Sequence, residues 1–351
     1  MDRAQLLELV EYGEVIEETD LSGMDLSGIS LDEAIFIRTS FANANLAGAS
    51  LRGAILDDCV LSGADLQGAD LRKTALLKPV LDGARLRGAR LVAAKLIEAS
   101  LVDADLEGAD LSLTAMVKPR LERTSFARCT LDRTNLVEPI CGPLNLSGAT
   151  MDRAVMSGAD LTQANLAGAV LRTVTLQRCR MSGMVLAGMD LRGLQLMECD
   201  LSGADLREAQ LVQSNFYAAN LTGARLDGVT AERAQFGNAV LEGASMKRAR
   251  LSQSIFVGAN LTGADCSQAV MRACVLQRAT CVRTLFTGVD LTHSDFTHAD
   301  ASGAGFVGAI LAGARFHRTK TRDAKWSDTT GMRGDDEELA RAEDWQANYR
   351  D

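Results

Sequence analysis

Apolar residues recur at every fifth position along most of this chain, beginning at Leu21 and ending at Trp326. A second column, two places earlier in each unit, is occupied mostly by Ala, as at Ala44 and Ala49. Asp or Asn recurs between the two columns, so the consensus is A(D/N)LxG. The frame runs through 62 units without an insertion or a deletion. Such a tandem repeat predicts one repetitive architecture and not several globular domains.

A period of five fits neither an α-helix nor a flat β-strand. At about 100° per residue, successive Leu residues would spiral around a helix and leave no single buried face. In a continuous strand, an odd period would send alternate Leu residues to opposite faces. Both difficulties disappear if the chain turns a corner after every unit, with the Leu and Ala columns pointing inward. The Gly that follows many of the Leu residues suits such a corner.

These repeats resemble the pentapeptide repeat family over about Thr19 to Trp326. The resemblance implies an all-β solenoid, a right-handed quadrilateral β-helix with four units per coil, in which residues 20 apart stack on one face. Four units per coil give about 15 coils. We therefore expect a partly helical N-terminal cap over residues 1–18, the β-helix over 19–326, and an acidic C-terminal segment with a short helix over 327–351.

Short helices are predicted near both ends of the chain. Residues 2–12 place Leu6 and Val10 on one face, and Gly13 would end this helix. In the second helix, Asp335 is the expected N-cap, with Glu338 at the capping-box position. Its apolar stripe consists of Leu339, Ala342, Trp345 and Tyr349. The simpler interpretation is that both helices cover the open edges of the end coils, and the alternative is dimerisation through the C-terminal helix.

Composition supports a narrow core and places the negative charge near the ends. Aromatic residues make up 4% of the sequence, which is little for a large globular core. The formal net charge is −9, but residues 21–326 carry 31 acidic and 33 basic side chains. The first residues show no basic region followed by an apolar segment, and no apolar run approaches the length of a membrane span. We therefore expect a cytoplasmic protein.

No residue set typical of catalysis or cofactor binding is recognisable. The eight Cys all fall in the inward columns, so we expect buried thiols and no disulfide, including for Cys179 and Cys199, which are 20 residues apart. His293, His298 and His317 fall in outward columns, and the last two are expected to be neighbours on successive coils. No carboxylate or Cys completes a set of metal ligands with them, so no metal site is predicted. The recurring Asp residues are interpreted as solvated repeat chemistry and not as catalytic acids.

Two departures from the consensus stand out. Large residues occupy the inward columns of one coil, which is therefore expected to be wider than its neighbours or to mark a change in twist: Met181, Met184, Met189 and Leu194. The second departure is an apolar strip expected on the outside of one face and its adjoining corner: Ile35, Ile37, Ile55, Leu77, Ile97, Val117, Val137, Pro79, Pro119 and Pro139. Stacked coils would make it large enough for a protein-binding patch, unless it reflects only the β-propensity of a sheet face.

The sequence favours a non-enzymatic protein-binding scaffold or adaptor of a bacterial type, acting through the apolar strip, the terminal helices, or both. The resemblance adds that some family members accompany secretion systems, and that others protect DNA gyrase from quinolones by mimicking DNA in shape and negative charge. The near-neutral charge of residues 21–326 argues against such a mimic. We expect a protein partner, with a homodimer as one form of it, no cofactor, no membrane and no direct contact with nucleic acid.

Overall fold

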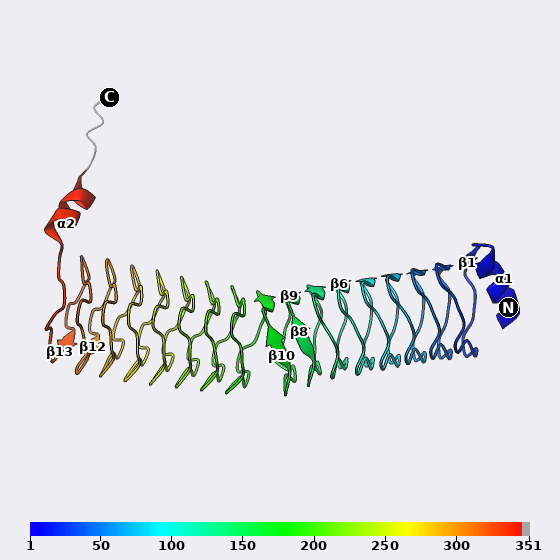
Figure 1. Ribbon diagram of the computed structural model, residues 1–351, viewed down its shortest axis with the longest axis horizontal. Coiled ribbons are helices and arrows are strands. Elements are labelled where there is room, and N and C mark those ends of the chain that lie inside the picture. The colour runs from blue at the N-terminus through cyan, green and yellow to red at the C-terminus, as the bar shows by residue number, and fades with distance from the viewer. Residues whose placement is uncertain (346–351) are drawn as a thin grey trace, which may run out of the picture. The chain divides into compact units, whose positions relative to one another are not determined.

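The computed structural model describes residues 1–345 (Figure 1). The chain divides into two compact units, Met1–Arg180 and Met181–Asp351. Each unit is a parallel β-solenoid, and the two contain about 16 turns in all, so the predicted fold class is confirmed. The boundary falls at the first residue of the coil in which the sequence places several large inward residues. In that coil Met184 is buried and Met189 is half-buried.

The first unit opens with helix α1 (Arg3–Glu11), as predicted. Asp2 is its N-cap, and the Asp2 carboxylate accepts the backbone N–H of Gln5 at 2.9 Å. The side chain of Gln5 accepts the backbone N–H of Asp2 at 2.9 Å, which completes a capping box. These two bonds satisfy backbone donors that the helix itself leaves unpaired.

Helix α1 covers the open edge of the first coil. Leu6 is fully buried. The guanidinium of Arg3 donates to the backbone carbonyls of Asp25 and Ser27 at 3.4 and 3.0 Å. Because an open edge presents unpaired backbone groups that could bind another chain, this contact protects the solenoid from edge-to-edge association.

One face of the first unit is a nine-stranded parallel sheet with the order β1-β2-β3-β4-β5-β6-β7-β9-β11. Adjacent strands pair with a register of 20 residues, as for Val15 with Ile35, because each coil contains four units. The strands are β1 (Val15–Glu17), β2 (Ile35–Ile37), β3 (Ile55–Asp57), β4 (Ala75–Leu77), β5 (Lys95–Ile97), β6 (Ala115–Val117), β7 (Asn135–Val137), β9 (Val155–Ser157) and β11 (Thr175–Gln177). A second sheet pairs β8 (Thr150–Asp152) with β10 (Val170–Arg172).

The solenoid begins earlier than predicted. Strand β1 lies within residues 1–18, the segment assigned to the N-terminal cap, yet it pairs with β2 in the regular register. Ile16 is 2% exposed and occupies the inward Leu column. The consensus hides this first unit, because acidic residues and a Val surround Ile16 where Ala, Asp and Gly are expected.

Two kinds of corner distinguish the nine-stranded face from the other faces. At a tight corner, the N–H of Ala49 donates to the carbonyl of Leu46 at 3.0 Å, and Gly48 has a φ of 64°. At the strand-face corners, the amides of Cys59 and Ala99 donate no backbone hydrogen bond within the described residues. Residues such as Ile and Val directly after the inward Leu favour the extended strand that replaces the tight turn there.

The second unit consists mainly of tight corners joined by isolated bridges at 20-residue intervals, as for Val185 with Asp205. Its regular strands within the described residues are β12 (Gly305–Phe306) and β13 (Lys325–Trp326). Aromatic rings fill part of its interior, and those of Phe306 and Trp326 stack with their centroids 4.2 Å apart. Coil pairing continues past Trp326, because the N–H of Phe316 donates to the carbonyl of Arg333 at 2.8 Å.

Helix α2 (Glu337–Asp344) begins one residue later than predicted. Its N-cap is Asp336, whose carboxylate accepts the N–H groups of Glu338 and Leu339 at 3.1 and 3.0 Å. The expected cap, Asp335, instead accepts the backbone N–H of Arg318 at 2.6 Å. The prediction chose the wrong member of an Asp-Asp pair because this contact with the solenoid is not visible in the sequence.

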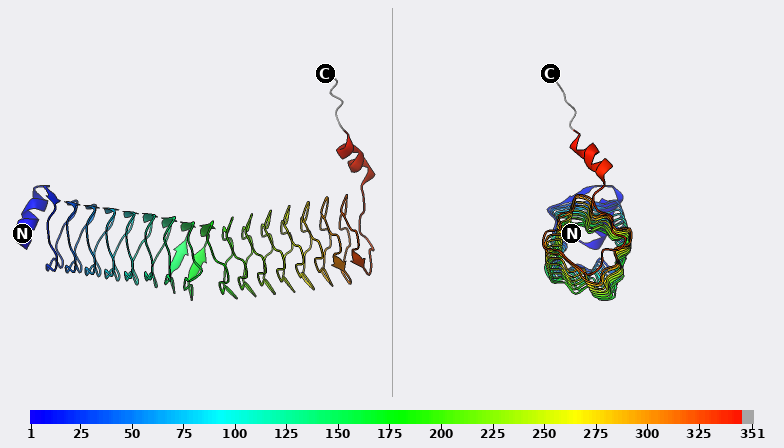
Figure 2. Two further views of the ribbon diagram at one scale, coloured as in Figure 1. Left: turned by 180° about the vertical axis from the view of Figure 1, so that it is seen from behind. Right: turned by 90° about the vertical axis from the view of Figure 1, so that its left-hand side faces the viewer.

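Helix α2 does not cover the end of the second unit, contrary to the interpretation we favoured. None of its residues is buried, and it lies outside the outline of the last coils (Figure 2). Of its predicted apolar stripe, Leu339 is 42% and Trp345 is 74% exposed. Ala342 is also exposed, and Tyr349 lies outside the described residues. Neither α1 nor α2 is long and apolar enough to cross a membrane.

Candidate functional sites

The outward residues of the nine-stranded sheet form two rows that follow the strand register. The row of third strand residues runs through Ile37, Asp57, Leu77, Ile97, Val117 and Val137. Four consecutive apolar side chains, Leu77 to Val137, therefore lie side by side on adjacent strands. Asp57 separates them from Ile37, an interruption that the sequence analysis did not include.

The row of first strand residues is apolar at the other end of the sheet. It runs through Val15, Ile35, Ile55 and Ala75 before it reaches Lys95. The two apolar runs overlap at strand β4, where Ala75 and Leu77 flank the buried Leu76. We call the two runs, Val15 to Ala75 and Leu77 to Val137, the apolar rows.

The apolar rows are accessible but flat. Ile55, Leu77 and Ile97 are 38%, 37% and 39% exposed, and Ile37, Val117 and Val137 are half-buried. Each side chain is shielded by its neighbours on the adjacent strands, as expected for cross-strand pairs about 5 Å apart. The face can contact a flat partner, and no deep cleft is required.

The three prolines assigned to the strip do not belong to it. Pro79, Pro119 and Pro139 are all buried, because they occupy the inward Ala column at the corner after the strand. A proline lacks the backbone N–H, and this corner is the one whose amide makes no backbone hydrogen bond at Cys59 and Ala99 within the described residues. The prolines are therefore compatible with the strand-face corner and have no outward surface for a partner.

The cysteines serve as interior residues. All are buried except Cys141, which is half-buried. Burial raises the pKa of the Cys129 thiol to about 12, and the Cys129 thiol donates to the carbonyl of Leu106 at 2.9 Å. Hydroxyls in the same column behave similarly, since Thr114 donates to the carbonyl of Leu91 at 2.7 Å. The inward polar groups are thus satisfied by carbonyls of the preceding coil.

The recurring Asp column stabilises the corners. The carboxylate of Asp65 accepts the backbone N–H of Gln67 at 3.1 Å, and this bond to the residue two places on recurs along the chain. Asp205 also pairs with Arg207 at 2.6 Å and with Arg225 at 3.5 Å. The hydrogen bond from Arg207 is the main cause that lowers the pKa of Asp205 to about 2. These carboxylates have structural partners, which explains their recurrence without a catalytic role.

A cluster that the sequence analysis missed joins helix α2 to the second solenoid unit. The Nε2 atoms of His298 and His317 lie 3.0 and 3.3 Å from the two carboxylate oxygens of Glu343. The expectation that no carboxylate completes a set with these histidines was therefore wrong. Glu343 lies outside the repeat register, so the spacing of the repeats cannot place it beside the histidines. The path of the chain after Arg333 determines its position.

The hydrogen bonds assign a tautomer to His317. Its Nδ1 accepts the backbone N–H of Asp336 at 3.1 Å, so the proton of the neutral ring is on Nε2, which faces Glu343. His317 is 3% exposed. Burial raises the pKa of Glu343, but the hydrogen bonds from His298 and His317 outweigh it and lower this pKa below its usual value.

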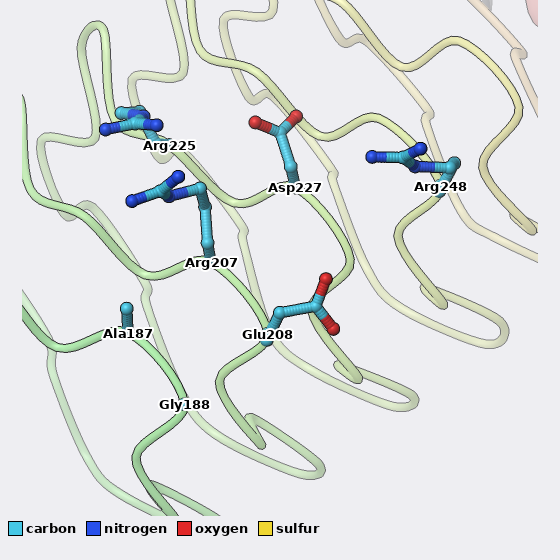
Figure 3. A pocket seen from close by; sticks show the side chains of 7 residues that line it. All are labelled: Ala187, Gly188, Arg207, Glu208, Arg225, Asp227 and Arg248. Atoms are coloured by element: carbon cyan, nitrogen blue, oxygen red, sulfur yellow. The ribbon is translucent and has the colours of Figure 1, made fainter.

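An open pocket in the second unit contains three arginines (Figure 3). It is lined by Ala187, Gly188, Arg207, Glu208, Arg225, Asp227 and Arg248. The hollow exists because the side chains of Ala187 and Gly188 are small. Arg207 and Arg225 both pair with Asp205. Because two of the three guanidinium groups are engaged in ion pairs on the repeat surface, we assign no ligand to this pocket.

The chain belongs to the pentapeptide repeat family. The family model described as "Pentapeptide repeats" matches residues 16–76, 80–112 and 144–320. The internal segment 113–143, which the family model does not match, contains Val117 and Val137 of the apolar rows together with two of the buried prolines. The resemblance inferred from the repeat is thereby confirmed, and the match starts at Ile16, in agreement with the early first strand.

Several similar solved structures are pentapeptide repeat proteins. HetL, a pentapeptide repeat protein involved in heterocyst differentiation regulation from the cyanobacterium Nostoc sp. strain PCC 7120, is 22% identical, with coverage of 90% of this chain and 96% of that chain and a TM-score of 0.24. Full-length QnrB1, a plasmid-mediated fluoroquinolone resistance protein, is 16% identical, with coverage of 76% and 94% and a TM-score of 0.17. Such low scores carry no argument about function. Among curated proteins, no sequence matches the chain.

Proposed function

We propose that this chain is a non-enzymatic protein-binding scaffold, and that the apolar rows of the first unit are its binding surface. The observation that carries the proposal is the run of Leu77, Ile97, Val117 and Val137 on adjacent strands. Water disfavours exposed apolar surface by roughly 25 cal/mol per Å². A second protein surface laid over the rows would recover that free energy, and a flat sheet face suits a flat partner.

A second copy of the chain is the first occupant to test. Two-fold pairing of a patch with itself is the commonest solution among soluble oligomers. Charged residues interrupt the apolar rows on either side of β4. Asp57 is the last residue of β3, and Lys95 is the first residue of β5. Such charges contribute little affinity but restrict the registers in which two flat faces can pair.

The decisive variant replaces Leu77 and Val117 by Asp together, because both side chains point away from the core. Sedimentation equilibrium would compare its mass with that of the natural chain, and circular dichroism would confirm that it folds. A matched control carries Val270→Asp and Leu285→Asp, since these residues of the second unit are 38% and 44% exposed and also outward. We expect self-association to be lost in the first variant and kept in the control.

A heterologous partner would give a different result in the same series. The natural chain would then be monomeric, and pull-down from the host followed by mass spectrometry should recover a partner with the natural chain and the control but not with the Leu77→Asp, Val117→Asp variant. Equal mass and equal partner recovery for all three proteins would refute the proposal and direct attention to the exposed side of α2.

The ion pairs on the solenoid surface argue against the alternative function, DNA mimicry. Asp65 pairs with Arg85 and Asp160 with Arg180, each at 2.9 Å, so an arginine one coil on offsets the carboxylate. A DNA mimic requires a continuous negative face. A gyrase supercoiling assay in the presence of a fluoroquinolone tests the alternative directly, and protection of supercoiling by this chain would favour it over the scaffold.

A further inference from the structure

We propose that His298, His317 and Glu343 bind a divalent transition-metal ion of the zinc type, which fastens helix α2 to the second solenoid unit. The inference is independent of the protein-binding proposal, because it concerns other residues in the other unit. The candidate ligand atoms, one from each residue, all lie within 4.8 Å of one another. Two imidazole nitrogens and a carboxylate oxygen are a donor set that zinc accepts readily.

The ligand atoms lie within a few ångströms of the spacing that a single ion requires. Zinc binds imidazole nitrogen and carboxylate oxygen at about 2.0–2.2 Å, so ligand atoms in a tetrahedral site lie about 3.3 Å apart. The Glu343 oxygens are 3.0 and 3.3 Å from the Nε2 atoms of His298 and His317. Because these contacts use different Glu343 oxygens and the ligand atoms lie up to 4.8 Å apart, binding one ion requires the side chains to turn toward a common point. Three protein ligands leave the fourth position for water.

The surrounding charges favour a cation. Glu343, Asp335 and Asp344 bring three carboxylates to this region, against the guanidinium of Arg318. Arg318 lies 3.1 Å from Glu343 through Nε and 2.6 Å from Asp344 through an Nη atom. Because its Nε atom contacts Oε2, Arg318 holds that oxygen of Glu343 and leaves Oε1, the oxygen beside His298, as the candidate metal ligand.

A second carboxylate is placed to support His317 as a ligand. Metal binding at Nε2 requires the ring proton to move to Nδ1, where it needs an acceptor. The carboxylate of Asp335 lies 3.8 Å from that Nδ1. In the metal-free state Nδ1 accepts the N–H of Asp336 instead. Binding of the ion would exchange this bond for one from Nδ1 to Asp335, which requires the two atoms to move from 3.8 Å into hydrogen-bond distance.

The consequence concerns the docking of helix α2. The helix has no buried residue, and polar contacts such as the bond from Arg318 to the carbonyl of Ala340 at 3.1 Å hold it to the coils. Polar contacts at the protein surface contribute little stability, even where they are partly buried. A metal bound jointly by His298, His317 and Glu343 would fix the helix and thereby set the orientation of its exposed residues Leu339 and Trp345.

Zinc titration of the untagged full-length chain tests the proposal. After dialysis against a chelator, calorimetry with ZnCl₂ should show one ion per chain, and Co²⁺ should give the visible absorption bands of a four-coordinate site. The variants His317→Ala and Glu343→Gln remove one ligand each and should weaken zinc binding by at least about tenfold, since even supporting residues around a metal contribute that much. His293→Ala and Glu338→Gln are matched controls and should bind as the natural chain does.

Limited trypsin digestion adds a readout of the helix. Arg341 is exposed in α2, and zinc should slow cleavage after it in the natural chain but not in the Glu343→Gln variant. Circular dichroism establishes that each variant keeps the solenoid. An absence of stoichiometric zinc binding, or equal affinity in the ligand variants and the controls, would overturn the proposal and leave the cluster as a hydrogen-bonded contact of the helix.

Discussion

The ring of Phe236 lies almost parallel to that of Phe256, with the two centroids 4.8 Å apart and an angle of 7° between the planes. Phe216 stacks on the other side of Phe236 at 5.0 Å. These spacings match the distance between neighbouring strands, because residues 20 apart lie on successive coils. The aromatic column is therefore a direct result of the register and part of the interior of the second unit.

Replacing Phe236 by Ala should destabilise the second unit by about 3–5 kcal/mol, because it leaves a cavity between two rings that cannot move together without breaking the coil register. Phe236→Leu restores the commonest residue of this column and should cost clearly less. Urea unfolding followed by circular dichroism measures both free energies. If both variants lose the same free energy of unfolding, ring stacking and side-chain volume at this position do not determine stability.

A proline should be accepted at Ala99 but not at Ala49. Ala99 has Pro79 and Pro119 at the equivalent positions of the adjacent coils, and Glu98 before it has a φ of 51°, close to the 47° and 50° of Lys78 and Lys118. The N–H of Ala49 donates to Leu46, so Ala49→Pro loses that bond and should cost at least about 1 kcal/mol.

Thermal melting of the Ala99→Pro and Ala49→Pro chains decides the matter. We expect a melting temperature near that of the natural chain for the first and a lower one for the second. If both substitutions lower it equally, the explanation of the buried prolines by a missing backbone hydrogen bond is wrong.

The solenoid should lose stability in acid through carboxylates such as Asp205. The pKa of Asp205 is lowered from 3.8 to about 2 in the folded chain. A lowered folded pKa stabilises the fold fully above the unfolded value, and this contribution disappears as the pH falls through about 2. Asp205→Asn keeps an acceptor for the corner amide but removes the charge, so its melting temperature should fall less between pH 5 and pH 2. An identical pH dependence in both chains would contradict this assignment.

Part of the candidate surface could be derived from the repeat frame together with the four units per coil that the family resemblance implies. Counting in fives places Ile97, Val117 and Val137 outward and 20 apart, and the strand register pairs them as expected. The same counting also places Pro79 in the inward column. The predicted strip nevertheless includes the prolines, because a proline at a corner is expected to be exposed to solvent. The repeat frame therefore predicts the burial of these prolines correctly, and only the expectation that proline is exposed was wrong.

The sequence by itself determined the solenoid and the inward direction of the Leu and Ala columns, whereas the 20-residue register followed from the resemblance to the pentapeptide repeat family. This is because each unit contacts only its neighbours in the stack, so a local pattern specifies the packing. Only the tertiary structure decided which face becomes a continuous sheet, where the N-cap of α2 lies and which carboxylate meets His298 and His317. Glu343 reaches these histidines from outside the repeat, through contacts between Arg318 and the segment around Asp335. Such contacts depend on the path of one non-repeating segment, and no period along the chain encodes that path.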